Sequence, residues 1–465
     1  MSELHELGVA EASKAIAAKT ISPSDLVEAL LVRIDKLNPK INAFIHPTAE
    51  AAQAAAKMAT EAIAAGRSQG RLHGVPFAIK DIYDTAGVAT TGHSKLYKAR
   101  VPQQDATTVA KLKAAGAISL GKLATHEFAT GGPCFDLPWP PARNPWNLDH
   151  FTGGSSSGSG AALAARLVPA ALGSDTSGSI RNPAAYCGIS GHKPTYGLCS
   201  RGGVMPLAQS LDHVGPMARS AEDCAYLLTA MQGADPRDPA AADRQPENFT
   251  ATLDRSIRGL RLGVVRRWHE RDMTGDPAQI KAFDEAVRAI EALGAETREL
   301  DMPPLAEIDA CCRTILHAEA FAVHREDLRT RSMDYAAMTR MRVLAGAALT
   351  AEEYMRAQRF RRVLTLRMTE AMRDVDAVLC CVYPAPAPEI EAMAKGPAMA
   401  FGPRGIASPF NITGGPAISV PCGFSAKGLP LNLQIAGRAF EDGMVLRVAH
   451  AFQKATDWHK RAPAL

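Results

Sequence analysis

Hydrophobic and polar positions follow a helical period through the first 65 residues of the chain. Residues 22–25, SPSD, combine a serine suited to a helix N-cap with a proline at the first helical position and an acidic residue at the third. The stretch LVEALLVRIDKLN, residues 26–38, then repeats its apolar residues about every 3.6 positions. We therefore expect a helix that ends at Asn38-Pro39, followed by an alanine-rich helix over residues 48–65.

Beyond residue 65 the pattern changes to short apolar runs of the kind that form buried strands. GVPFAIKD (74–81) and AISLGK (117–122) lie on either side of DATTVAKLKAAG (105–116), which has a helical period and ends in a glycine. Further predicted elements are the strands LVPAALGSD (167–175) and RLGVVRR (261–267), the amphipathic helix DPAQIKAFDEAVRAIEALG (276–294), and the hairpin strands AISVPCGF (417–424) and LNLQIAG (431–437). Strands mixed with helices along the whole chain predict a layered α/β fold.

The segment 232–256, QGADPRDPAAADRQPENFTATLDRS, is polar and rich in proline, which is typical of a linker or a surface excursion. It could mark a domain boundary, but the strand patterns on its two sides are alike, and large α/β sheets often form one domain. We expect a single domain over residues 1–465. Its parts would be a helical segment (1–65), a core with the candidate chemistry (66–231), the surface linker, and the rest of the sheet with helices of a substrate channel (257–465).

Charge is balanced along the chain. The 52 lysines and arginines nearly match the 48 aspartates and glutamates, and the net charge is +4. This is too small and too dispersed to indicate nucleic-acid binding or attraction to an anionic membrane. The hydrophobic content of 46% is that of an ordinary globular protein, and no apolar run reaches the length of a membrane span. Because the N-terminal stretch also lacks an apolar h-region, we expect a soluble, cytoplasmic protein.

The nine cysteines are scattered and form no C-x-x-C motif. Neither a disulfide framework nor a zinc site is indicated. No histidine, cysteine or carboxylate cluster has the spacing of metal ligands. We therefore expect reduced cysteines, no metal and no cofactor.

Two motifs suggest chemistry that their context does not support. Residues 116–122, GAISLGK, match the start of a phosphate-binding loop, but Leu123 stands where that loop needs a serine or threonine for magnesium. Residues 154–158, GSSSG, match the nucleophile elbow of α/β-hydrolases. That elbow directly follows a strand, whereas the preceding residues 140–152 are rich in proline and asparagine. No later histidine stands in a context that marks it as the base.

Two clusters of glycine and serine indicate a different arrangement. GGSSSGSG (153–160) and DTSGSIRNPA (175–184) are separated by the helical AALAARL and the strand VPAALGSD, so one helix–strand return can bring them together. Ordered elements on both sides argue against a flexible linker. Upstream, Lys80 ends the apolar run GVPFAI, and a lysine that closes a buried strand is costly unless it has a partner or a task.

Taken together, these stretches resemble the amidase signature family. The resemblance rests on GVPFAIKD, on residues 153–197 around the two glycine-serine clusters, and on the closing GGPAISVPCGF and LPLNLQIAGR, in the family's order. Ser155 follows Lys80 by 75 residues and precedes Ser179 by 24, as the family's pattern requires. The resemblance implies a single α/β/α domain in which helices cover a large, twisted, mixed and mainly parallel sheet.

The resemblance also implies roles for individual residues. Ser179 would be the nucleophile that forms an acyl-enzyme, Ser155 a bridging serine in a cis conformation, and Lys80 the base. The oxyanion hole would be formed by backbone N–H groups of Thr176, Ser177, Gly178 and Ser179. The acyl group of the substrate would bind beside Ala129, Thr130 and Gly131.

The residues themselves suit this chemistry. A serine hydroxyl becomes a good nucleophile only when a base takes its proton. The ordinary pKa of lysine is about 10.4, and enclosure at an apolar strand end can lower it by roughly 3–5 units, which leaves a neutral amine near neutral pH. Ser155 can then pass its proton to Lys80 while it accepts the proton of Ser179. The serines would be crowded because a proton must move between them.

The chain departs from the family pattern at Ser177 and Ser157, where glycine is common. A serine at position 177 can narrow the oxyanion turn or restrict its backbone, so the family pattern does not define the acyl group that this protein prefers. Residues 131–146, a proline-rich loop with two tryptophans, and residues 380–384, CCVYP, are expected to form walls of the substrate channel.

The expected function is hydrolysis of an amide-type C–N bond, linear amides first, to a carboxylate and an amine or ammonia. The expected partner is a small amide or carbamate, and a homodimer is one expected assembly. Three alternatives stay open: a glutaminase-type subunit of an amidotransferase complex, a carbamate or urea hydrolase of the same family, and a binding protein on an inactive amidase scaffold.

Overall fold

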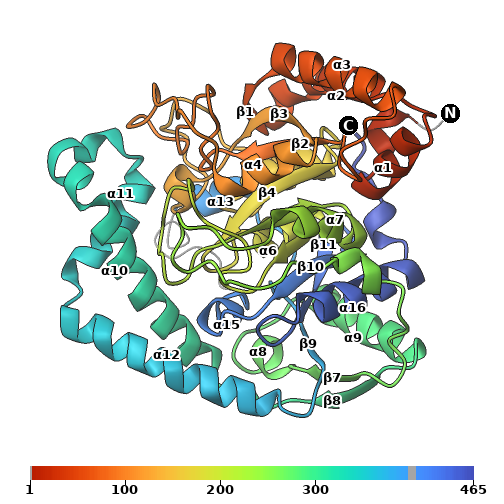
Figure 1. Ribbon diagram of the computed structural model, residues 1–465. Helices are drawn as coiled ribbons and strands as arrows, with labels where there is room; N and C mark the ends of the chain where they lie inside the picture. Colours follow the sequence, from red (N-terminus) through yellow and green to blue (C-terminus); the bar gives the residue numbers. More distant parts are fainter. Residues whose placement is uncertain (1–2, 396–404) are drawn as a thin grey trace.

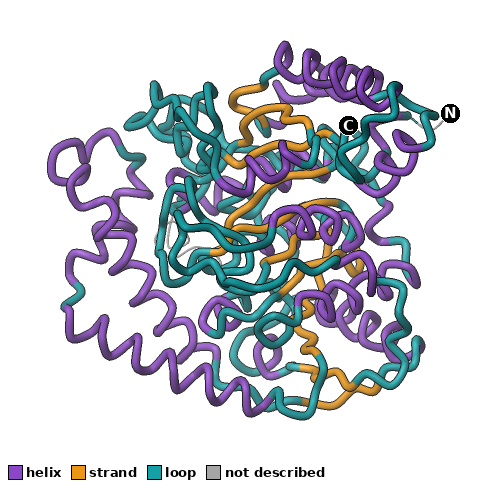
Figure 2. Tube along the Cα trace, in the orientation of Figure 1, coloured by secondary structure: helices purple, strands orange, loops and turns teal. Residues whose placement is uncertain are grey.

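The computed structural model describes residues 3–395 and 405–465. Its strands are β1 (Phe44–Pro47), β2 (Pro76–Lys80), β3 (Ile118–Leu123), β4 (Ala170–Asp175), β5 (Ser190–Lys193), β6 (His213–Ala218), β7 (Arg261–Val264), β8 (Glu296–Glu299), β9 (Ala377–Cys380), β10 (Ala417–Phe424) and β11 (Pro430–Ala436). These eleven strands of the described chain form one sheet in the order β1-β3-β2-β4-β6-β5-β10-β11-β9-β7-β8. The sheet runs through the centre of the molecule (Figure 2).

Helices surround this sheet (Figure 1). They are α1 (Val9–Ala17), α2 (Pro23–Ile41), α3 (Ala49–Ala64), α4 (Thr107–Ala114), α5 (Ser157–Ala164), α6 (Arg181–Cys187), α7 (Ala221–Met231), α8 (Arg267–Glu270), α9 (Pro277–Ala292), α10 (Leu305–Arg331), α11 (Ala337–Leu344), α12 (Ala351–Ala371), α13 (Ile390–Ala394), α15 (Ser408–Ile412) and α16 (Asp442–Ala455). In the described part of the chain, no helix combines the length and the apolar character needed to cross a membrane.

The sheet is mixed, as expected. Four of its strand pairs are parallel, β2 with β3 and β4, and β7 with β8 and β9, while the other six are antiparallel. Antiparallel pairs therefore outnumber parallel ones in the described sheet, against the expected balance. Strand β6 lies antiparallel between β4 and β5, and β10 and β11 form an antiparallel hairpin next to β5. Antiparallel neighbours can be joined by short turns and need no crossover helix.

Two apolar cores lie on opposite faces of the sheet. Strand β9 shows this directly, because its residues alternate between them. Ala377 and Leu379 belong to the larger core, which includes α7, α9 and α16. Val378 and Cys380 belong to the second core, which is formed with α10, α12 and α15. The expected layered α/β architecture is confirmed by this arrangement.

The N-terminal helices begin where the sequence predicts. In α2 the Ser22 hydroxyl accepts the Asp25 N–H at 3.1 Å, and the Asp25 carboxylate accepts the Ser22 N–H at 3.2 Å. The helix does not end at Asn38-Pro39 but continues to Ile41, because a proline in the last turn removes only one backbone hydrogen bond. Asn42 then ends the helix in a left-handed conformation, with φ of 55°.

The proline-rich segment 232–256 is packed against the rest of the molecule. Gln232 and Glu247 exchange hydrogen bonds across it, from the Gln232 amide to the Glu247 carbonyl and from the Glu247 N–H to the Gln232 side chain. Phe249 is 1% exposed and belongs to the larger core. Strands from both sides of the segment share one sheet. The single-domain organisation stays a prediction, and this shared sheet supports it.

If this segment is a structural part of the fold, Phe249→Ala should destabilise the protein by about 3–5 kcal/mol, because it empties a filled core position. Phe135, which is 51% exposed, provides a matched control, and Phe135→Ala should have little effect. Denaturant unfolding of both variants measures the difference. Equal stability of the two variants would show that the segment is a dispensable excursion.

Candidate active site

Two neighbouring parallel strands bring the first candidate residues together. Strands β2 and β4 are paired at Ala78 and Ala171. The carboxyl ends of parallel strands lie at the same edge of a sheet, which is the usual place for a site in an α/β fold. Lys80 is the last residue of β2, and Ser174 is the penultimate residue of β4. The sheet itself therefore places the lysine against the segment that leads to Ser179.

The Lys80 amine lies among three serine hydroxyls. Its Nζ is 2.8 Å from Ser155 Oγ, 3.0 Å from Ser156 Oγ and 2.8 Å from Ser174 Oγ. The side chain is fully buried. Burial lowers the pKa of Lys80 to about 7, against the opposing effect of the Asp175 and Asp212 carboxylates. The amine can therefore be neutral at a pH where an ordinary lysine is charged.

Ser155 and Ser156 lie at the entrance to α5. The peptide bond between Gly154 and Ser155 is cis, the conformation that the family resemblance implies for Ser155. Position 154 has no room for a larger residue, because a Cβ there would lie 1.9 Å from Cε1 of His126. His126 is buried and stacks on Phe151 with ring centroids 5.7 Å apart.

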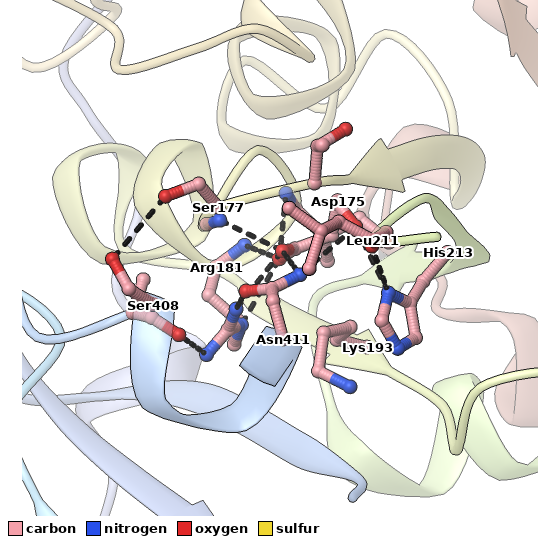
Figure 3. A network of polar contacts seen from close by, with 12 residues as sticks. Asp175, Ser177, Arg181, Lys193, Leu211, His213, Ser408 and Asn411 are labelled. Atoms are coloured by element: carbon pink, nitrogen blue, oxygen red, sulfur yellow. Dashed lines mark hydrogen bonds and ion pairs between the residues drawn. The ribbon is translucent and has the colours of Figure 1, made fainter. Parts of the chain in front are cut away.

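The turn that carries Ser179 is held by Asp175, a residue that the sequence analysis did not single out. The Asp175 carboxylate accepts the N–H groups of Gly178 at 2.7 Å and of Ile180 at 3.2 Å. It also pairs with the Arg181 guanidinium, with Nη2 2.9 Å from Oδ1 and Nε 3.0 Å from Oδ2 (Figure 3). The carboxylate thus fixes the backbone on both sides of Ser179.

Arg181 links this turn to the C-terminal part of the chain. Its guanidinium donates to the Asn411 side chain at 2.7 Å, to the Gln434 side chain at 2.7 Å and to the Ala407 carbonyl at 3.0 Å. Burial alone would raise the pKa of Asp175, but the Arg181 charge and hydrogen bonds hold it well below its ordinary value. The pair is therefore ionised and fully hydrogen-bonded within the interior.

These contacts reduce the set of donors expected for an oxyanion hole. The Gly178 N–H points to Asp175 and is not directed into the cavity. The hydroxyl of Thr176 donates to Asp212 at 2.6 Å, which fixes the start of the turn. Burial raises the pKa of Asp212 to about 6. Since the Gly178 N–H is bonded to Asp175, three of the four expected donors remain, namely the backbone N–H groups of Thr176, Ser177 and Ser179.

Ser155 and Ser179 both line a cavity of about 180 Å³. Thr176 and Ser177 line it as well, together with the three residues expected beside the acyl group, Ala129, Thr130 and Gly131. Lys80 lies behind Ser155, outside the residues that line this cavity. The described contacts include no direct hydrogen bond between the Ser155 and Ser179 hydroxyls. Such contacts are often long without substrate and shorten in the complex.

The wall at residues 127–131 has an unusual backbone. Phe128 and Ala129 both have positive φ, 49° and 61°, which residues other than glycine rarely adopt. Buried Glu127 holds this wall by accepting the Ser94 hydroxyl at 2.6 Å and the Ala336 N–H at 2.9 Å. Left-handed residues of this kind persist where the surroundings enforce them, often at functional sites.

A further part of the cavity lining consists of polar residues that sequence reasoning missed. Asp309, Arg313 and His317 follow one another at one-turn intervals on α10 and line the cavity. Arg342 of α11 lines it too and donates to the Gly131 carbonyl. The helical spacing of the α10 residues is visible in the sequence, but nothing local indicates that their face meets the serines.

The expected channel walls are only partly found. From the loop 131–146 only Gly131 and Gly132 line the cavity, and from residues 380–384 only Tyr383 does. The two tryptophans lie elsewhere. Trp146 donates to the Cys187 carbonyl at 2.8 Å, and Trp139 packs on His46 and His93.

The other polar candidates have structural partners. His192 contacts Asp442 at 3.0 Å, and His213 contacts the Leu211 carbonyl at 2.6 Å. All nine cysteines are buried and free. Within residues 3–395 and 405–465, no three histidine, cysteine or carboxylate side chains form a group that could hold a metal ion. The span 116–122 begins in the turn after α4 and continues into β3, so it is not a loop between a strand and a helix.

Comparison with known proteins identifies the class. The family model described as Amidase matches residues 25–446. A protein of Azotobacter vinelandii, named as a subunit of glutamyl-tRNA(Gln) amidotransferase, is 40% identical over 99% of each chain. Among solved structures, a chain of a vestigial protein complex, described as revealing the evolutionary origins of an s-triazine catabolic enzyme, is 34% identical with a TM-score of 0.90, over 96% of this chain and 98% of that chain. The peptide amidase of Stenotrophomonas maltophilia is 29% identical with a TM-score of 0.86, over 98% of each chain.

The chain belongs to the amidase family. The expected layered α/β fold with a large mixed sheet and the expected broad activity, hydrolysis of an amide-type C–N bond, are confirmed by this membership.

Asp175→Asn tests the support of the turn. The variant leaves the buried Arg181 charge without its counter-ion, and we expect a loss of about 3–5 kcal/mol in the free energy of unfolding. Asp254, whose side chain is 78% exposed beside Lys454, is the control. Asp254→Asn should cost less than about 1 kcal/mol. Denaturant titration of both variants decides, and an Asp175→Asn protein as stable as the control would contradict the assigned role.

Treatment with EDTA should leave the activity unchanged, because the expected chemistry uses a lysine and two serines and no metal. The measurement is the rate of amide hydrolysis before and after dialysis against the chelator. Loss of activity that added zinc restores would contradict a metal-free mechanism.

Proposed function

We propose that the protein hydrolyses a small linear amide through an acyl-enzyme on Ser179, with Lys80 as the base and Ser155 as the proton relay. The observation that carries this proposal is the contact of a buried Lys80 amine, with a pKa of about 7, with Ser155 at the edge of the cavity that Ser179 also lines. Within residues 3–395 and 405–465, no other titratable side chain has a hydrogen bond to the hydroxyl of Ser155 or Ser179.

The proton count supports the direction of the relay. A neutral amine has two N–H donors and one lone pair, so of the three hydroxyls around Lys80 two accept and one donates. If Ser155 donates to Nζ, its oxygen faces Ser179 with free lone pairs. Ser179 then loses its proton to Ser155 as it attacks the carbonyl carbon, and Ser155 passes its own proton to Lys80.

Collapse of the tetrahedral intermediate reverses this movement. The protonated Lys80 returns a proton to Ser155, and Ser155 protonates the departing amine, so that the C–N bond breaks without release of an amide anion. Water then enters, loses a proton through the same relay, and attacks the acyl-enzyme. Ser179 recovers its proton from Ser155 as its bond to the acyl carbon breaks, and the carboxylic acid that leaves ionises to the carboxylate in water.

The negative charge on the carbonyl oxygen would be held by the N–H groups of the turn. Each donor of such a hole is typically worth about 3 kcal/mol in the transition state. We propose Ser177 and Ser179, with Thr176, as the donors. Gly178 is removed from the expected set because its N–H already serves Asp175.

A second candidate function is that of a glutaminase-type subunit of an amidotransferase. The observation that favours it is the 40% identity, over 99% of each chain, to the Azotobacter vinelandii protein whose name places it in such a complex. Assay of the isolated chain on glutamine and on a panel of unrelated amides separates the two. A free-standing hydrolase would turn over amides other than glutamine without a partner chain. Turnover of glutamine alone would favour the role in a complex.

The pH dependence tests the base. The neutral fraction of Lys80 increases with pH through its pKa of about 7, so kcat/KM should rise through that range and level off above about pH 8. Lys80→Ala should lower kcat by about 10²–10⁴-fold at neutral pH. Ser159→Ala is the control, because Ser159 is also buried in α5 but donates to the Leu172 carbonyl at 2.8 Å. A profile that falls with rising pH, or a Lys80 variant as active as the control, would contradict the assignment.

Labelling with a fluorophosphonate identifies the nucleophile. The reagent should attach to Ser179, and Ser179→Ala should abolish labelling altogether. Ser155→Ala should slow labelling by about 10²-fold, since it interrupts the relay. Peptide mass spectrometry locates the adduct. Ser156 is the alternative candidate for the nucleophile, because its hydroxyl also contacts Lys80. An adduct on Ser156 would overturn the proposed roles.

A further inference from the structure

The hydroxyl of Ser177 is the first member of a polar chain that leads away from the nucleophile. Ser177 Oγ lies 3.3 Å from Ser408 Oγ, and Ser408 Oγ donates to Asp309 Oδ1 at 2.8 Å (Figure 3 shows Ser177 and Ser408). All three residues line the cavity that Ser179 enters. The proposed mechanism gives the Ser177 side chain no task.

The direction of the hydrogen bonds in this chain follows from the number of protons. A serine hydroxyl has one proton, and that of Ser408 goes to the Asp309 carboxylate. Ser177 must therefore donate to Ser408, since otherwise the two oxygens would face each other without a proton between them. The Ser177 hydroxyl has no second proton to offer to a substrate.

The remaining capacity of Ser177 is that of an acceptor. The thiol of Cys312 lies close to Ser177, and burial raises its pKa to about 12, so the thiol is neutral and has one proton. A hydroxyl oxygen has two lone pairs. If the thiol uses one, the other is left for a group in the cavity, to which Ser177 is partly exposed.

The position of the Ser177–Ser408–Asp309 network indicates which part of the substrate the Ser177 hydroxyl contacts. The departing amine must lie beside Ser155, which protonates it in the proposed mechanism. Ser177 is two residues before Ser179, and its hydroxyl bonds to a network on α10 and α15, whereas the relay is formed by the end of β2 and the entrance to α5. The Ser177 oxygen therefore faces the acyl part of the substrate, close to the scissile carbonyl.

From these observations we infer that Ser177, oriented by Ser408 and Asp309, selects substrates whose acyl group carries an N–H donor next to the scissile carbonyl, such as an α-amino or ureido group. The inference rests on the proposed function and specifies its substrate class. A site built to bond a substrate N–H group rejects an analogue without that group, because the polar group of the site is then left unpaired.

Alaninamide and isobutyramide provide the test, because they differ only in an α-ammonium in place of a methyl group. The wild-type protein should prefer alaninamide in kcat/KM by about tenfold or more. Ser177→Ala should reduce this preference about tenfold, and Ser177→Thr, which keeps the hydroxyl, should retain it. Ser408→Ala should lower the preference as well, because it frees the Ser177 proton to point into the cavity. Fluorophosphonate labelling of Ser179 in each variant verifies that the turn is intact.

The outcomes separate this inference from the proposed function. Equal kcat/KM values for the two amides in the wild type, or a preference that survives Ser177→Ala, would overturn the selection by Ser177 and leave the hydrolase intact. Hydrolysis of other amides with no turnover of either probe would do the same. Failure to hydrolyse any amide, together with no labelling of Ser179, would overturn the proposed function and this inference with it.

Discussion

The ion pair between Asp175 and Arg181 is the interaction on which the rest of the site depends. It joins the end of β4 to the start of α6, and the turn with Ser179 lies between its two members. Arg181 extends the same network to Asn411 and Gln434, far away in the sequence. Because the pair is buried, neither charge can be satisfied by water, and the geometry of the turn is tied to the packing of the whole sheet.

The same dry interior has opposite effects on two neighbouring ionisable groups. Burial opposes the charged form of both Lys80 and Asp175. Asp175 stays ionised because a guanidinium and several N–H donors surround it, whereas Lys80 is surrounded by neutral hydroxyls and tends to lose its proton. One group thereby becomes a fixed structural charge and the other a titrating amine. The difference arises from their partners and not from their depth in the protein.

Much of the fold and the centre of the site could be predicted from the sequence. The cap at Ser22, the strands that end at Lys80 and Asp175, and the closeness of the two glycine-serine clusters all follow from local pattern and chain order. The strand directions in the middle of the sheet could not, since pairing depends on contacts distant in sequence. The wall with Asp309 and Arg342 was missed for the same reason: helical spacing shows which side chains share a face, but not what that face meets. The close contact between Gly154 and His126 became visible only in three dimensions.

The way Asp175 holds the turn has a consequence for how such a protein can change over generations. The Asp175 carboxylate accepts hydrogen bonds from the backbone N–H groups of Gly178 and Ile180. These bonds do not involve the side chain at position 177. The turn can therefore keep its shape while that side chain varies. A single codon change at this position would alter what the cavity recognises without disturbing the nucleophile, so the scaffold offers a short mutational route from one substrate to another.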